Sequence, residues 1–130
     1  LPTATLKADR VATLPGTPED VWPLAHDVVA TYEDLWGQPL DVVYEEVPNL
    51  LVVATNKPSE DAIDASLAIR FNCGADQTTT MHVRERYLTN GWRERAEALV
   101  AIGKTYAAAT VGLLRATRAL SVSPEANDLR

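Results

Sequence analysis

The chain has 130 residues, a typical length for one domain with one hydrophobic core. Apolar residues make up 46% and charged residues 23%, an ordinary balance for a globular protein, and no apolar run approaches the roughly 20 residues that cross a membrane. The formal charge of −6 argues against a nucleic-acid-binding role, because phosphate binding needs a positive surface. One cysteine excludes an intramolecular disulfide, and with only two histidines we expect no metal site.

The first ten residues lack the basic and apolar segments of a signal peptide, so we expect a cytoplasmic protein. The sequence begins at Leu1, which leaves open whether further residues precede it. Near the other end, Pro124 would stop a helix, and the residues around it are polar. We therefore expect a single domain over residues 1–122 and a flexible tail over residues 123–130.

The first part of the chain predicts a strand followed by two short helices. Thr5–Leu14 places apolar residues among polar ones and is bounded by a Pro-Gly pair, which is typical of a strand. Thr17–Asp20 has the pattern of a helix start, with a capping threonine, a proline in the first turn and an acid that can reach back. Pro23 is expected to bend or shorten this helix. A second helix is predicted over Val29–Trp36, ending at Gly37.

The middle of the chain predicts antiparallel strands. β-Branched residues are frequent in Asp41–Val47 and Leu50–Thr55, and the Pro-Asn pair between them indicates a turn. The clearest period-two alternation follows in Ile63–Cys73 and continues in Thr78–Leu88. The residues expected on the inner face of the sheet from the first of these two segments are Ile63, Leu67, Ile69 and Phe71.

Trp92–Leu120 predicts a long C-terminal helix, about 43 Å at 1.5 Å per residue. Apolar side chains at steps of three and four residues form one stripe, which begins with Trp92 as an expected structural plug. Glycine and alanine within this stripe leave room for an apolar cavity between the helix and the sheet. The helix residues expected to line this cavity are Leu99, Gly103, Tyr106 and Ala107.

Several short motifs together resemble the START-like helix-grip (SRPBCC) superfamily. Leu14–Trp22, with the sequence LPGTPEDVW, looks like its proline-containing turn, helix-start acid and Val-Trp pair. His26-Asp27 is similar to its acidic residue near the first helix end, Trp36-Gly37 to a later tryptophan, and Gly91-Trp92 to its Gly-Trp helix opening. The resemblance implies an α+β helix-grip fold: a curved antiparallel sheet wrapped around a long C-terminal helix, with two short helices after the first strand.

Glu85 is the polar residue of greatest interest. It lies within the row Met81, Val83, Glu85 and Tyr87, and if this row faces the cavity, a carboxylate and a phenol enter an apolar space. Burial disfavours a charged carboxylate, which would make Glu85 a ligand anchor or, as the one candidate catalytic residue, a general acid or base. The opposite register, with His82, Arg84 and Arg86 inside, remains open at this point, and so does a Glu85 paired with an arginine at a strand end.

The remaining reactive residues favour structural roles. Cys73 has no histidine nearby in the sequence, so we expect a small buried apolar residue rather than a nucleophile. Arginines around the end of the last strand alternate with glutamates, which indicates a salt-bridged surface rather than an anion site. These arginines are Arg84, Arg86, Arg93 and Arg95.

The function expected from these observations is the binding of a small hydrophobic molecule in the cavity, without a cofactor or metal. The superfamily also contains polyketide cyclase/dehydrases and activators of a heat-shock-protein ATPase, so the resemblance also implies two alternatives, in that order. One is an enzyme acting in the same cavity, and the other is a co-chaperone-like interaction domain. The ligand, the presence of an enzymatic activity and a homodimeric state all stay open in the sequence.

Overall fold

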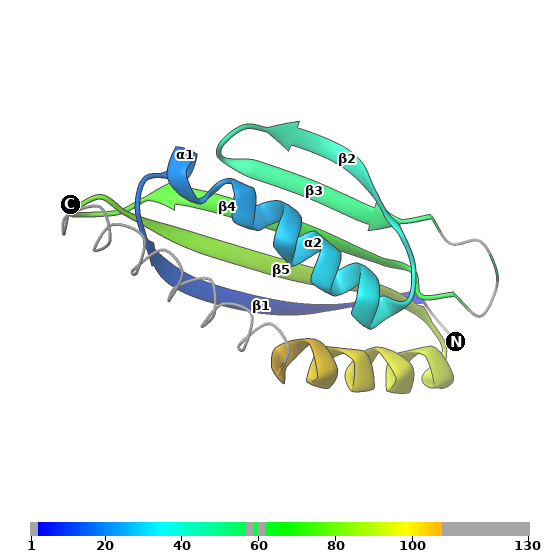
Figure 1. Ribbon diagram of the computed structural model, residues 1–130. Coiled ribbons are helices and arrows are strands. Elements are labelled where there is room, and N and C mark those ends of the chain that lie inside the picture. The colour runs from blue at the N-terminus through cyan, green and yellow to red at the C-terminus, as the bar shows by residue number, and fades with distance from the viewer. Residues whose placement is uncertain (1–2, 57–58, 60–61, 108–130) are drawn as a thin grey trace.

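The fold is seen in a computed structural model that describes residues 3–56, 59 and 62–107. Its five strands form one antiparallel sheet in the order β1-β5-β4-β3-β2, and two helices follow β1 (Figure 1). The strands are β1 (Thr3–Pro15), β2 (Leu40–Glu46), β3 (Leu50–Thr55), β4 (Ala65–Cys73) and β5 (Thr78–Asn90), and the helices are α1 (Pro18–Val21) and α2 (Pro23–Trp36). Residues 92–107 form a further helix. The expected continuation of this helix to Leu120 and the tail over residues 123–130 lie outside the described residues.

The segment after β1 folds as its capping residues predict. The side chain of Thr17 accepts from the Asp20 amide, and the Asp20 carboxylate accepts from the Thr17 amide at 3.0 Å, which completes a capping box. The helix is interrupted at Trp22, because Pro23 lacks an amide hydrogen and suits a first helical position. For this reason α2 begins at Pro23, earlier than the predicted Val29. It ends at Trp36, and Gly37 caps it with a φ of +66°, a conformation that favours glycine.

The alternation in the strands gives the sheet one apolar face and one polar face. The register pairs Ile69 with Val83 and Phe71 with Met81, so the buried rows of β4 and β5 lie side by side. The predicted positions of Leu67, Ile69 and Phe71 on the inner face are confirmed by their burial, whereas Ile63 precedes β4 and is partly buried. The other register, with the arginines of β5 inside, is excluded. Because β1 pairs with β5 along its whole length, its even-numbered residues join the inner face.

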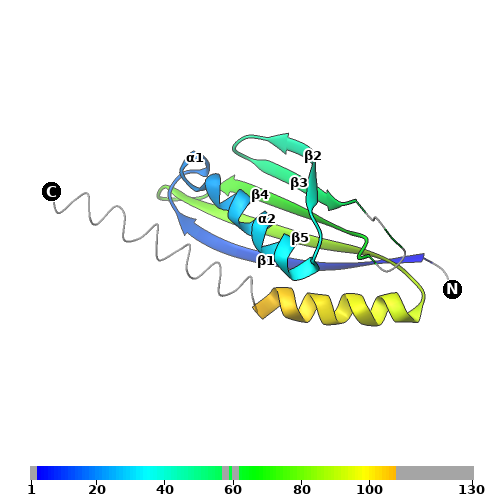
Figure 2. The same cartoon turned by 45° about the vertical axis from the view of Figure 1, so that its right-hand side comes forward.

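Two helices cover the inner face. α2 crosses the sheet obliquely, and residues 92–107 run alongside β1 (Figures 1 and 2). Tyr32 and Trp36 of α2 are buried in the core, and their rings meet edge to face with centroids 5.1 Å apart. Within residues 92–107, Ala98 is the buried apolar residue, and Ala101 and Ile102 pack against the core. These side chains pack between the helices and the sheet.

The C-terminal helix turns a different face to the sheet from the one that we predicted. Trp92, Leu99 and Tyr106 are 70%, 61% and 60% exposed, so the predicted stripe faces away from the core, and Trp92 is not a plug. The buried face is rotated around the helix axis by about one residue position from the predicted stripe. The small side chains of Ala98 and Ala101 let the helix approach the sheet closely, and the Thr105 hydroxyl donates to Glu85. The expectation for Cys73 is also wrong, since this residue is exposed at the end of β4.

Candidate functional site

Glu85 is the centre of a buried polar cluster on the inner face of the sheet. It is 0% exposed, and both carboxylate oxygens accept hydrogen bonds from hydroxyl groups. Oε2 accepts from the Tyr32 hydroxyl at 2.7 Å, and Oε1 accepts from Tyr87 at 2.6 Å and from Thr105 at 2.7 Å. We call Arg10, Tyr32, Glu85, Tyr87 and Thr105 the Glu85 cluster. A buried carboxylate without such partners would be costly, so these donors are what allow it to lie in the core.

Arg10 adds a positive charge to the cluster from β1. Its Nη2 lies 3.4 Å from Glu85 Oε2 and donates to the Ile102 carbonyl at 3.3 Å. The guanidinium also lies 4.7 Å from the centroid of the Tyr106 ring, which places it in cation–π contact. Its Nε is buried and has no hydrogen-bond partner among the described residues. The Nε–H of Arg10 is therefore a buried hydrogen-bond donor that bonds to no acceptor of the Glu85 cluster.

The two tyrosines of the cluster are held in their neutral, donating form. Burial raises the pKa of Tyr32 far above its ordinary value, and the charge of Glu85 and its hydrogen bond raise that pKa further. Burial also raises the pKa of Tyr87, together with its hydrogen bond to Glu85. Trp36 Nε1 donates to the Tyr87 hydroxyl at 3.2 Å. The proton donors of the cluster are therefore fixed in orientation, and Glu85 is the acceptor that all of them share.

Four elements meet at this cluster. β5 supplies Glu85 and Tyr87, β1 supplies Arg10, α2 supplies Tyr32, and the C-terminal helix supplies Thr105. The register places Ala8 opposite Glu85, so Arg10 is a diagonal neighbour of Glu85 across the β1–β5 pair. Hydrogen bonds to one carboxylate thus join both helices to the sheet.

The sequence analysis singled out Glu85 and Tyr87 but missed Arg10, Tyr32 and Thr105. A signal for Arg10 exists, because it is the one charged residue in the inward row of β1, whose other members are apolar. An arginine in such a row needs a buried anion, and Glu85 is the matching acid on the paired strand. Tyr32 lies one turn before Trp36 on the buried face of α2. No signal in the sequence distinguished Thr105 from the other small residues of its helix.

The other predicted site residues divide into two groups. Met81 and Val83 are buried next to Glu85 on the inner face of β5. The four predicted cavity residues of the C-terminal helix lie on its exposed side, and a Cβ added at Gly103 would meet no atom within 4 Å. The expectation that these four residues face the sheet is therefore wrong. They are Leu99, Gly103, Tyr106 and Ala107.

The sheet and its two covering helices define a helix-grip fold of the α+β class. Solved structures with this arrangement include DR_A0006 from Deinococcus radiodurans, with a TM-score of 0.54 and 12% identity over 87% of this chain and 95% of that one. CalU16 from Micromonospora echinospora has a TM-score of 0.52 and 15% identity over 88% and 85% of the two chains. SA2116 from Staphylococcus aureus, of unknown function, has a TM-score of 0.50 and 13% identity over 98% of each chain. At these identities the likeness shows a shared fold.

No family model matches the sequence, and no curated protein matches it significantly. Among the described residues, no helix combines the length and the apolar character needed to cross a membrane.

Proposed function

We propose that the protein binds a small hydrophobic molecule between the inner face of the sheet and the C-terminal helix, with the Glu85 cluster at the ligand's polar end. The observation that carries this proposal is the convergence of a carboxylate, an arginine and three hydroxyls on one point of an apolar face. Ligand sites of this kind are mostly apolar and use a few placed polar groups to orient the molecule. Met81 and Val83 supply the adjoining apolar surface, and Glu85 and Tyr87 supply the anchor.

The unused donor of Arg10 indicates what the ligand carries. Arg10 Nε is buried without a partner among the described residues, and a buried donor left unpaired is costly. A carbonyl or hydroxyl oxygen of a ligand next to Arg10 would accept this hydrogen bond. The proposed ligand is therefore a mainly hydrocarbon molecule with an oxygen near one end.

A neutral dye tests this site. Nile red fluorescence should rise in a saturable manner with the wild-type protein, and a neutral ketone should displace the dye better than a hydrocarbon of the same size. Ala98→Leu adds a larger side chain at a buried position of the helix that faces the sheet, so it should weaken dye binding about tenfold or more. Ala96→Leu makes the same change on the exposed side of the same helix and should leave binding unchanged.

Equal dye affinity in a folded Ala98→Leu protein and in the wild type would overturn the inner site. Far-ultraviolet circular dichroism and urea unfolding establish that the variant is folded. Arg10→Lys gives a second measurement that does not depend on the helix: it keeps the positive charge but removes the unpaired Nε–H, so it should leave hydrocarbon binding in place and remove the preference for the ketone.

Acid–base catalysis in the same site is the enzymatic alternative. Because burial and Glu85 raise the pKa of both tyrosines, they stay protonated at neutral pH, and Glu85 is the base available in the cluster. If the protein is an enzyme of this kind, a bound polyketide-like molecule should change mass or absorbance on incubation with the wild type. The same molecule should remain unchanged with Glu85→Gln.

A protein-interaction role is a second candidate, favoured by one specific observation. The C-terminal helix exposes large apolar side chains, namely Trp92, Leu99, Val100 and Tyr106. Exposed apolar surface of this kind marks contact sites in other proteins. Nile red binding that is lost in Leu99→Glu but retained in Ala98→Leu would favour this exposed face over the inner site.

A further inference from the structure

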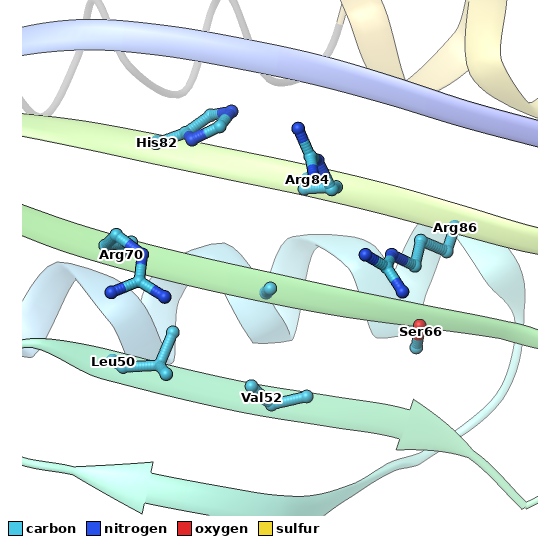
Figure 3. Close-up of a pocket in the computed structure, with 8 residues that line it drawn as sticks. Leu50, Val52, Ser66, Arg70, His82, Arg84 and Arg86 are labelled. Atoms are coloured by element: carbon cyan, nitrogen blue, oxygen red, sulfur yellow. The ribbon is translucent and has the colours of Figure 1, made fainter.

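A second hollow lies on the opposite face of the sheet from the Glu85 cluster. It has a volume of about 370 Å³, within the range of small-molecule sites. Its floor is formed by β3, β4 and β5, and the side chains of Arg70, Arg84 and Arg86 stand around it (Figure 3). We call it the outer hollow. The residues that line it are Leu50, Val52, Ser66, Ala68, Arg70, His82, Arg84 and Arg86.

The positive charges of the outer hollow are only partly neutralised. Asp9 Oδ1 lies 2.7 Å from Arg84 Nε and 3.0 Å from His82 Nε2, so this one carboxylate engages both residues. The Arg84 guanidinium holds the pKa of Asp9 below its usual value. Arg70 and Arg86 make no hydrogen bond or ion pair with any residue that the structure describes. Two exposed guanidinium groups therefore remain without a counter-charge.

No carboxylate of the described residues forms an ion pair with Arg70 or Arg86. Across the sheet from Arg86, β1 places Lys7, a further cation. Beyond β3, Glu46 of β2 is the register partner of Leu50, and its Oε2 already accepts from the Tyr44 hydroxyl at 2.7 Å. Asp41 of β2 is opposite Ala54, which pairs with Ser66, so it lies in the cross-strand row of Arg86 but with β3 and β4 between the two residues. A positive surface thus persists over β4 and β5 in a chain whose formal charge is −6.

We propose that the outer hollow binds a small organic anion, with a phosphate or carboxylate between Arg70 and Arg86. The register pairs Arg86 with Ser66, four residues before Arg70 on β4, which separates the two backbones by about 13 Å along the strands. Long arginine side chains reaching inward from both ends can meet one anion over Ala68, and guanidinium groups bind phosphate and carboxylate in a bidentate manner.

The floor of the outer hollow selects for an apolar part in the same molecule. The strand register pairs Val52 with Ala68 and Leu50 with Arg70. These apolar side chains form a surface next to the proposed anion position. An aryl or alkyl phosphate fits this combination better than inorganic phosphate. The proposed ligand therefore carries an anionic phosphate or carboxylate group attached to a hydrocarbon part. Such a molecule is either a soluble metabolite or a lipid at a membrane surface.

Nuclear magnetic resonance titration of the whole chain tests the proposal. Phenyl phosphate should shift the backbone amides of Ala68, Arg70 and Arg86 saturably, and it should bind more tightly than inorganic phosphate. Arg70→Gln and Arg86→Gln should each weaken binding about tenfold, because each removes a charged donor. Arg93→Gln, the matched control, removes the same charge at a position 83% exposed on the C-terminal helix, and should change affinity less than twofold. Raising the salt concentration should weaken phenyl phosphate binding in the wild type.

Vesicles separate the two sources of the anion. Sedimentation with phosphatidylcholine vesicles that contain phosphatidic acid, absent with phosphatidylcholine alone and lost in Arg70→Gln, would assign the outer hollow to a membrane lipid. Binding of phenyl phosphate without vesicle binding would assign it to a soluble molecule. The proposal is overturned if no saturable shift and no vesicle binding occur, or if Arg93→Gln weakens binding as much as the other two variants. Nile red binding at the inner site is on the other face, so Arg70→Gln should not alter it.

Discussion

Tyr32→Phe tests whether the Glu85 cluster holds the helices to the sheet. The change removes one hydroxyl and keeps the ring that packs on Trp36 with centroids 5.1 Å apart. Glu85 Oε2 then loses its donor at 2.7 Å and retains Arg10 Nη2 at 3.4 Å. Because the carboxylate is fully buried, water does not replace the lost donor.

The expected loss follows from the burial and from the charge of the acceptor. A hydrogen bond to a charged group contributes about 1.5–3 kcal/mol, and a buried group left short of a partner adds to the cost of its loss. We therefore expect Tyr32→Phe to lower the free energy of unfolding by about 2 kcal/mol. This is a large part of the stability of a domain, which is typically about 5–15 kcal/mol.

Urea unfolding followed by circular dichroism measures this loss as a shift of the midpoint at constant slope. The matched control is Tyr44→Phe, because the Tyr44 hydroxyl donates to the Glu46 carboxylate at the same distance of 2.7 Å but lies at the surface. Tyr44→Phe should leave the midpoint nearly unchanged, because water replaces an exposed partner. Equal midpoint shifts in the two variants would refute the conclusion that burial makes the Glu85 cluster important to stability.

Three further outcomes are expected. Urea unfolding at pH 8–11 should show the free energy of unfolding falling above about pH 10. Tyrosines ionise there in the unfolded chain, whereas the raised pKa values of Tyr32 and Tyr87 keep both residues neutral in the folded protein. The fall should be smaller in Tyr87→Phe, which has one such tyrosine fewer. Gly103 lies in the middle of the C-terminal helix with open space around it, so Gly103→Leu should raise the free energy of unfolding by about 0.5–1 kcal/mol and leave Nile red binding unchanged. Loss of dye binding in this variant would contradict the helix face seen in the structure. Gly16→Ala should lower the free energy of unfolding by more than about 1 kcal/mol in the same assay, because Gly16 has a φ of +110° and the added Cβ would lie 3.1 Å from Asp20 Cβ. An unchanged urea midpoint would argue against this turn.

The strands and the first helix were predictable because local patterns determine them. Period-two alternation in Ile63–Cys73 specified the face of β4, since a shift of one residue would bury Arg70 and expose Ile69. The capping residues of Thr17–Asp20 fixed the start of α1 in the same local way. The alternation in β5 allowed two registers, and only the pairing of β5 with β4 placed Glu85 on the inner face.

The sequence by itself thus determined the strands, the helix start at Thr17 and the inner face of β4, and it made an inward Glu85 one of two open registers of β5. Only the tertiary structure decided which face of the C-terminal helix packs on the sheet, because small and apolar residues occur on two neighbouring faces and periodicity does not choose between them. The same is true of the outer hollow, whose arginines without an ion pair among the described residues come from two strands brought together by pairing. Contacts of Glu85 with Arg10, Tyr32 and Thr105 join residues up to 75 positions apart, and such proximity is a property of the fold rather than of any local pattern.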